Sequence, residues 1–494
     1  MAKTLMRDLV VLLPGITGSV LQHNGEDLWG LSGRAAWRVL VHLGKDFDKL
    51  RLEQDDLDSD DLGDGIRATR VMPDVHIVPG LMKVDGYSTT ANMIRNNFEI
   101  VEGQIGDSAP ANFYEFPYDW RRDNRVAARQ LKALIDRQLP AWRKHSYDRD
   151  AKVILIGHSM GGLVARYYLE VLKGENWRNC KALITLGTPY RGALNAVNYM
   201  ANGYKKLFVD LTEVMRSFTS MYQLLPIYEA VKVDKSFQRV AETAGISGID
   251  LDRAKEALAF HRQIEEAVDQ HRQTADYHSS GYTLIPYVGT RQPTLQSAEL
   301  QDGRLVASRI APEIVPEDLS DGDGTVPRIS AIPIELSNKY RETYKPEQHG
   351  SLQSNSDILD DMCERLRLMQ APSLAKIRGP DFGSEPAAIG LVIEDVYLAD
   401  EPVELRAQLY KPKDNSEDKK QDVPLEGIKL EAVVTSVEAA GAMPICKPFA
   451  DEDEQRIITL DGLAPGAYRV EVRSTEAGPG APKPVHALFA VAGP

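Results

Sequence analysis

A serine stands at the centre of the segment GHSMG (157–161), which has the GxSxG pattern of a nucleophile elbow. In such an elbow a sharp strand-to-helix turn strains the serine backbone and exposes its Oγ, and small flanking residues relieve the crowding. The apolar run KVILIG (152–157) is typical of a buried parallel strand, and the residues after Met160 have helical apolar spacing. This context, more than the bare pattern, predicts that Ser159 is a catalytic nucleophile.

A nucleophile of this kind needs an acid and a histidine later in the chain, in the order Ser, acid, His. Asp323 is flanked by glycines in GDGTV, where the chain can turn tightly and aim a carboxylate inward, so we predict that it is the acid. Only two of the ten histidines follow it. His486 lies in the alternating segment VHALFAVA and is expected to be an ordinary strand residue. His349 stands in EQHG on a predicted loop, and we expect it to accept the Ser159 proton and return it to the leaving group.

Some of these residues also have non-catalytic interpretations. A calcium loop around Asp323 does not fit, because the first and last EF-hand ligand positions would fall on Leu319 and Ser330. A plain acidic turn remains an alternative for Asp323. Thr325, two residues further on, is a candidate for substrate contact. His158 neighbours the nucleophile, but its side chain should point away, so we expect a structural role.

Acyl chemistry also needs two preorganised N–H donors for the developing oxyanion. One should be the backbone N–H of Met160, directly after the nucleophile. The other should come from the turn PGITG (14–18) after the first apolar stretch. Ile16 is the preferred donor there and Thr17 a close second, since the backbone rather than the side chain acts.

The elements that must position these residues alternate between strand and helix. Apolar runs at 9–13, 152–157 and 181–187 predict buried parallel strands. The segment 125–143 has helical spacing that Pro140 is expected to interrupt. This alternation indicates an α/β fold with a mainly parallel sheet, and with the elbow it predicts an α/β-hydrolase.

Two further regions differ from this pattern. Residues from 195 to about 273 are helical in pattern and rich in Met, Leu and Tyr, which predicts a helical cap insertion over about 195–280 or an extra structural layer. From 387 to 494 short segments alternate apolar and polar residues between turns, which predicts an all-β, immunoglobulin-like sandwich. The catalytic domain is accordingly placed at 1–376.

Composition limits the function classes. The 494 residues carry 58 basic and 72 acidic side chains, a formal net charge of −14, which argues against nucleic-acid binding and against simple attraction to anionic membranes. Three widely spaced cysteines outside any CxxC pattern favour a reducing compartment over disulfides or a zinc site. The N-terminal apolar stretch is too short for a secretory leader. We therefore expect a cytoplasmic protein without metal or cofactor, with leaderless export as an alternative.

Several stretches together resemble the lecithin:cholesterol acyltransferase family. They are VVLLPGITGSVL, LWGLSGRAAW, FPYDWRR, ILIGHSMGGLVARYYL, ITLGTPYRGA, SMYQLLP, YVGTRQPT, GDGTVP and QHGSL, in the family's order between about residues 8 and 354. The resemblance implies the triad Ser159, Asp323 and His349, working through an acyl-enzyme on glycerolipid esters. It also implies that Trp29 and Trp37 belong to a membrane-contacting or lid region, although two core tryptophans remain an alternative.

The sequence departs from this family in three ways. It has no leader and no cysteine before Cys180, and Asn195 stands where a head-group lysine is expected. The C-terminal β region is not part of the family's core and suggests added targeting or partner binding.

The main functional hypothesis is cleavage or transfer of acyl groups from glycerophospholipids, with peripheral membrane contact. The alternatives are a non-lipid esterase or thioesterase, and a latent lipase that a regulatory protein controls through the β region.

Overall fold

A computed structural model describes residues 2–29, 47–73, 76–78, 82–174, 176–206, 209–301, 303–336, 343–371, 384–385, 387–410, 413–414, 428–438, 442–450, 455–475 and 481–492. At its centre lies a parallel sheet of six strands, which in spatial order are β19 (Tyr344–Lys345), β16 (Thr283–Gly289), β11 (Cys180–Leu186), β10 (Val153–His158), β2 (Leu9–Leu13) and β9 (Phe113–Glu115). All residues of β2 and β10 are buried, as expected for a parallel sheet covered on both faces.

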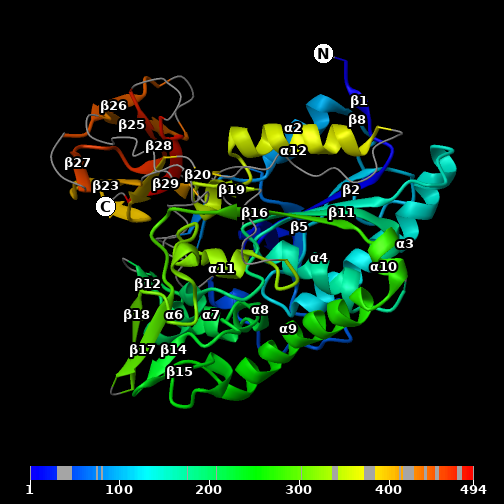
Figure 1. The fold of residues 1–494 in the computed structure, drawn as a ribbon, viewed down its shortest axis with the longest axis horizontal. Helices are drawn as coiled ribbons and strands as arrows, with labels where there is room; N and C mark the ends of the chain where they lie inside the picture. Colours follow the sequence, from blue (N-terminus) through cyan, green and yellow to red (C-terminus); the bar gives the residue numbers. More distant parts are fainter. Residues whose placement is uncertain are drawn as a thin grey trace.

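Helices cover both faces of this sheet (Figure 1). On one side lie α2 (Ser88–Asn97) and α12 (Ser356–Met369), and on the other lie α3 (Asn124–His145) and α4 (Met160–Glu170). The mixed α/β fold with a central parallel sheet agrees with the prediction of an α/β-hydrolase.

Helix α3 corrects one expectation, because it continues past Pro140 to His145. Trp142 lies beyond the proline, is buried, and donates from Nε1 to the carbonyl oxygen of Arg7 at 2.8 Å. This tertiary contact holds the last turn, although Pro140 has no N–H to donate within the helix.

The insertion between β11 and β16 is only partly helical, contrary to the sequence pattern. Its helices are α6 (Leu194–Asn202), α7 (Thr212–Ser217), α8 (Thr219–Tyr222), α9 (Leu251–Arg272) and α10 (Ala275–Ser280). It also contains β12 (Lys205–Lys206), β13 (Val209–Asp210), β14 (Val231–Val233) and β15 (Ser236–Gln238). Strand β14 pairs with its neighbour β15 in a local hairpin and also with a strand that follows β16 in the chain, a second pairing that joins distant parts of the sequence.

Smaller elements complete this part of the chain. One antiparallel sheet contains β3 (Ser19–His23), β4 (Glu26–Trp29) and β5 (Ile66–Val71), and another joins β14 and β15 to β17 (Ser297–Gln301) and β18 (Arg304–Ser308). Short elements are β1 (Thr4–Leu5), β6 (His76–Val78), β7 (Met82–Val84), β8 (Phe98–Glu99), α5 (Asn176–Asn179) and α11 (Arg328–Ala331). Among the helices that the structure describes, none combines the length and the apolar character needed to cross a bilayer.

The C-terminal region consists of β-strands with a hydrophobic core of its own. One sheet contains β21 (Ala388–Val392), β23 (Val403–Tyr410) and β27 (Gln455–Leu460). The other contains β22 (Val396–Leu398), β29 (Val485–Ala492), β28 (Gly466–Ser474), β25 (Leu430–Ser436) and β26 (Ile445–Pro448). The strands β20 (Ser384–Glu385) and β24 (Lys413–Asp414) form a separate short antiparallel pair. The immunoglobulin-like class of this region stays a prediction.

Candidate active site

Ser159 occupies the sharp turn between strand β10 and helix α4. Its backbone has φ of 50° and ψ of −124°, a left-handed conformation that a residue with a Cβ adopts only under strain. Gly161 is required by the close approach of the backbone at the end of β2, because an added Cβ would lie 2.5 Å from the Pro14 carbonyl oxygen. The local sequence thus forms the predicted elbow, with Ser159 above the carboxyl end of the sheet.

The structure brings Ser159, Asp323 and His349 together from three distant parts of the chain. His349 Nε2 lies 3.0 Å from Ser159 Oγ, and its Nδ1 lies 2.7 Å from Asp323 Oδ2. All three residues are buried. A serine hydroxyl, an imidazole and a carboxylate in this order can transfer the serine proton to the imidazole and stabilise the imidazolium that forms.

The backbone around Asp323 holds its carboxylate in place. Asp323 Oδ1 accepts hydrogen bonds from the N–H groups of Thr325 at 2.9 Å and Val326 at 2.6 Å. The carbonyl oxygen of Asp323 accepts from the N–H of His349 at 2.8 Å. The tight GDGTV turn therefore orients the acid and fixes the loop of the base at the same time. Among the described residues, no group of three or more His, Cys, Asp or Glu is arranged to hold a metal ion.

The turn after β2 lies directly against the nucleophile. A Cβ added at Gly15 would be 2.9 Å from the Ser159 Cβ, and Thr17 has a positive φ of 61°. Met160 is the first residue of α4, where the backbone N–H has no partner within the helix. The segments of both predicted oxyanion donors, Ile16 and Met160, therefore border Ser159, and the choice of Ile16 over Thr17 stays a prediction.

A buried hydrogen-bonded chain links this turn to the catalytic histidine loop. The Gly15 N–H donates to the Tyr87 hydroxyl at 2.8 Å, and that hydroxyl lies 2.8 Å from His158 Nδ1. His158 Nε2 lies 3.1 Å from the carbonyl oxygen of His349, to which it donates in the neutral tautomer. Burial, with a smaller contribution from the charge of His349, lowers the pKa of His158 from 6.5 to about 3. His158 thus supports the site while neutral, and the sequence offered no sign of Tyr87 as its partner.

His486 lies in strand β29, as predicted, but its side chain also contacts the loop that carries the base. Its Nδ1 lies 2.8 Å from Glu347 Oε2, and its backbone N–H donates to Glu347 Oε1 at 3.0 Å. Glu347 is buried and stands two residues before His349. Burial by itself lowers the pKa of His486, but the hydrogen bond and charge of Glu347, with the charges of Glu471 and Asp85, raise it overall. The C-terminal region therefore contacts the loop that carries the base.

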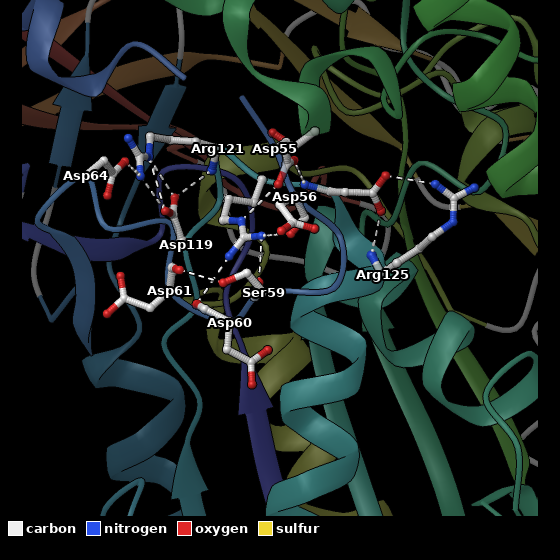
Figure 2. Close-up of polar contacts among 12 residues, drawn as sticks. Asp55, Asp56, Ser59, Asp60, Asp61, Asp64, Asp119, Arg121 and Arg125 are labelled. Carbon is white, nitrogen blue, oxygen red and sulfur yellow. Dashed lines mark hydrogen bonds and ion pairs between the residues drawn. The ribbon is translucent and has the colours of Figure 1, made fainter. Parts of the chain in front are cut away.

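The FPYDWRR motif (116–122) is bound by side chains of an acidic segment that precedes it in the chain (53–64). Figure 2 shows the carboxylates of Asp64 and Asp119 pointing toward the Arg121 guanidinium. The distance from Arg121 Nη2 is 2.8 Å to Asp64 Oδ2 and 2.6 Å to Asp119 Oδ2. The Arg121 side chain is fully buried. Arg122 pairs with Asp55 at 2.9 Å in the same network. Asp64 and Asp55 of this acidic segment thus bind the two arginines of the motif.

The structure describes two of the three residues that were predicted to contact substrate or membrane. Trp29 is only 3 % exposed, donates from Nε1 to the Thr17 carbonyl oxygen at 3.0 Å and packs against Trp120, so it is a core residue and not a membrane contact in this structure. Trp37 lies outside the described residues. Thr325 lines a cavity beside His349, and its contact with substrate stays a prediction.

Comparisons with known proteins bear on the family. The profile of the lecithin:cholesterol acyltransferase family matches residues 80–283, which include Ser159. Phosphatidylcholine-sterol acyltransferase of Gallus gallus is 31% identical over 150 residues, which are 26% of this chain. The match spans only 32% of that relative.

Solved structures give weaker similarities. The Tle4–Tli4 complex has a TM-score of 0.45 with 16% identity, over 73% of this chain and 97% of that chain. Phospholipase PlaB from Legionella pneumophila has a TM-score of 0.18 with 10% identity, over 98% of this chain and 90% of that chain. At these scores neither likeness bears on function. The sequence match confirms the resemblance predicted from the motifs: over residues 80–283 the chain is similar to the lecithin:cholesterol acyltransferase family.

Proposed function

We propose that this protein is a serine lipid hydrolase or acyltransferase, which cleaves acyl esters of glycerophospholipids through an acyl-enzyme at Ser159. The observation that carries the proposal is the continuous path from Ser159 Oγ to His349 Nε2 at 3.0 Å and from His349 Nδ1 to Asp323 Oδ2 at 2.7 Å. The strained backbone of Ser159 adds support, because strain of this kind persists where the surrounding structure imposes it.

The proposed reaction has two halves. In the first, Ser159 Oγ attacks the ester carbonyl carbon and its proton passes to His349 Nε2, while Asp323 stabilises the imidazolium. The N–H groups of Met160 and Ile16 stabilise the oxyanion. The tetrahedral intermediate collapses, the bond to the alcohol breaks, and His349 gives its proton to the leaving oxygen. In the second half water or an acceptor alcohol attacks the acyl-enzyme, and its proton follows the same path.

A lipid ester is favoured over other esters by the family relationship. The named relative is, by its printed name, an acyltransferase that acts on a phosphatidylcholine and a sterol, and the family profile covers the nucleophile segment. Water and an alcohol are alternative acceptors for one acyl-enzyme, so hydrolysis and transfer belong to the same proposal.

The test compares the wild type with Ser159→Ala on mixed phospholipid vesicles. We expect the wild type to release fatty acid and lysolipid, and to form a new ester when an alcohol is added, whereas Ser159→Ala does neither. A fluorophosphonate should label only the wild type. Faster cleavage of short water-soluble esters or thioesters than of vesicle lipids would support the rival non-lipid esterase. Equal release by both proteins would refute the role of Ser159.

A further inference from the structure

A cavity of about 200 Å³ lies where the C-terminal β region meets the loops of Asp323 and His349. One of its walls consists of residues from this region, namely Leu391, Val392, Ile393, Asp395 and Leu488. Helix α6 of the insertion contributes Asn195 and Tyr199 on another side. The cavity is therefore shared by the insertion, the catalytic loops and the C-terminal region.

The wall formed by β21 is tied to the catalytic loops by directed hydrogen bonds. Gln292 donates from Nε2 to the Ile389 carbonyl oxygen at 3.0 Å and accepts from the Leu391 N–H at 3.1 Å. Gln348, the residue before His349, donates from Nε2 to the Leu391 carbonyl oxygen at 3.0 Å. Two side-chain amides thus hold β21 in register beside the triad, and the wall has a fixed position relative to His349.

The position of His349 determines where the alcohol of the ester must lie during the reaction. His349 protonates the oxygen of the departing alcohol, so that alcohol must lie on the His349 side of Ser159. In the second half-reaction the incoming water or alcohol gives its proton to the same nitrogen and occupies the same side. The described lining includes Asp323, His349 and Thr325 but not Ser159 or the candidate oxyanion donors Ile16 and Met160, so the cavity adjoins the triad on the side of the base and the acid.

The lining also indicates what kind of alcohol fits. Several side chains around the cavity carry hydrogen-bonding or charged groups, namely Asn195, Tyr199, Arg309, Thr325, Gln348 and Asp395. Arg309 supplies a positive charge and Asp395 a negative one. This mixture suits a phosphate-bearing glycerol alcohol better than an acyl chain, which would be buried against apolar side chains alone.

We propose that this cavity binds the alcohol portion of the ester, and that the C-terminal β region selects the alcohol as part of the active site. The leaving alcohol occupies it during acylation, and water or an acceptor alcohol occupies it during deacylation. The inference rests on the proposed serine chemistry and adds to it the site and the chemical class of the alcohol.

The test changes the size of one wall residue. Val392 is partly exposed at the end of β21, so Val392→Trp fills the cavity and Val392→Ala enlarges it. Ile457→Trp is the matched control, because Ile457 is 45% exposed on β27 of the same sheet and does not line the cavity. Two ester series serve as substrates, one with butyrate on methanol, glycerol and glycerophosphocholine, and one with increasing acyl chains on methanol.

We expect Val392→Trp to lower kcat/KM for the glycerophosphocholine ester relative to the methyl ester by about tenfold or more. Val392→Ala should shift the same ratio in the opposite direction, and Ile457→Trp should leave it unchanged. Acyl-chain preference and the rate of Ser159 labelling by a small fluorophosphonate should stay as in the wild type.

An alcohol preference that does not respond to Val392→Ala and Val392→Trp, or an acyl-chain preference that responds instead, would overturn the inference. If Val392→Trp does not fold, as judged from its Tm, Val392→Ala decides alone. Loss of both Ser159 labelling and ester cleavage in the wild type would refute the proposed function itself, which separates the two failures.

Discussion

Replacing His158 with glutamine tests whether this residue supports the site as a neutral imidazole. The buried ring lies between the Tyr87 hydroxyl and the His349 carbonyl oxygen. Glutamine keeps one donor and one acceptor but cannot bind a proton in this range. The variant therefore retains the hydrogen-bonding capacity and removes the titration.

The expected loss of stability on acidification follows from the lowered pKa of His158. In the unfolded chain His158 binds a proton below about pH 6.5, whereas in the folded protein it does so only when the pH falls to its lowered pKa of about 3. The stability that neutral His158 contributes is therefore present above pH 6.5 and is lost as the pH falls toward 3. Between about pH 7.5 and about pH 5 this one histidine should remove about 2 kcal/mol from the free energy of unfolding.

Urea unfolding at the two pH values measures this loss in the wild type and in His158→Gln. The wild type should lose about 2 kcal/mol more than the variant on acidification. The buried His261, whose pKa burial also lowers to about 4, is present in both proteins and cancels in the comparison. His278→Gln, at an exposed position, is the control and should behave as the wild type. Equal losses in the wild type and in His158→Gln would refute a buried, neutral His158.

Three further changes have defined outcomes. Gly161→Ala places a Cβ 2.5 Å from the Pro14 carbonyl oxygen, so we expect fluorophosphonate labelling of Ser159 to slow by at least about tenfold; labelling at the wild-type rate would contradict the packing argument. Arg121→Met leaves two carboxylates without their buried partner and should cost about 3–5 kcal/mol of unfolding free energy in urea, against less than about 1 kcal/mol for the exposed Arg67→Met. His486→Gln removes the imidazole that lies beside the buried Glu347 carboxylate. Because the pKa of His486 is raised in the folded protein, the stability that this contact contributes is present at low pH and is lost as the pH rises, so urea unfolding should show a larger cost of the substitution at about pH 5 than at about pH 8; an equal cost at both pH values would contradict this linkage.

The candidate triad could be predicted because each member carries a local signal. Gly161 and the strand before Ser159 mark the elbow, since only a small residue tolerates the approach of Pro14. Glycines around Asp323 mark a turn that orients a carboxylate, and chain order then leaves two histidines. The choice of His349 rested on the strand pattern around His486, and the structure brings His349 to Ser159.

Strands that are fully buried could also be predicted from the sequence. The apolar runs at 9–13 and 152–157 predicted central strands, and β2 and β10 occupy them, because a strand buried on both faces must be apolar throughout. The insertion was less predictable, since β14 is stabilised by pairing with β17, which is distant in the chain.

The sequence by itself determined the identity of the three candidate catalytic residues, the parallel sheet that carries them and the resemblance to the lecithin:cholesterol acyltransferase family, because these depend on local turns, periodicity and chain order. Only the tertiary structure decided which residues support them. Tyr87 meets His158 across 71 residues, and Glu347 meets His486 across 139, through contacts that no local pattern encodes. Burial likewise decided the position of Trp29, because an aromatic side chain suits a core as well as a membrane surface and only the packing around it distinguishes the two.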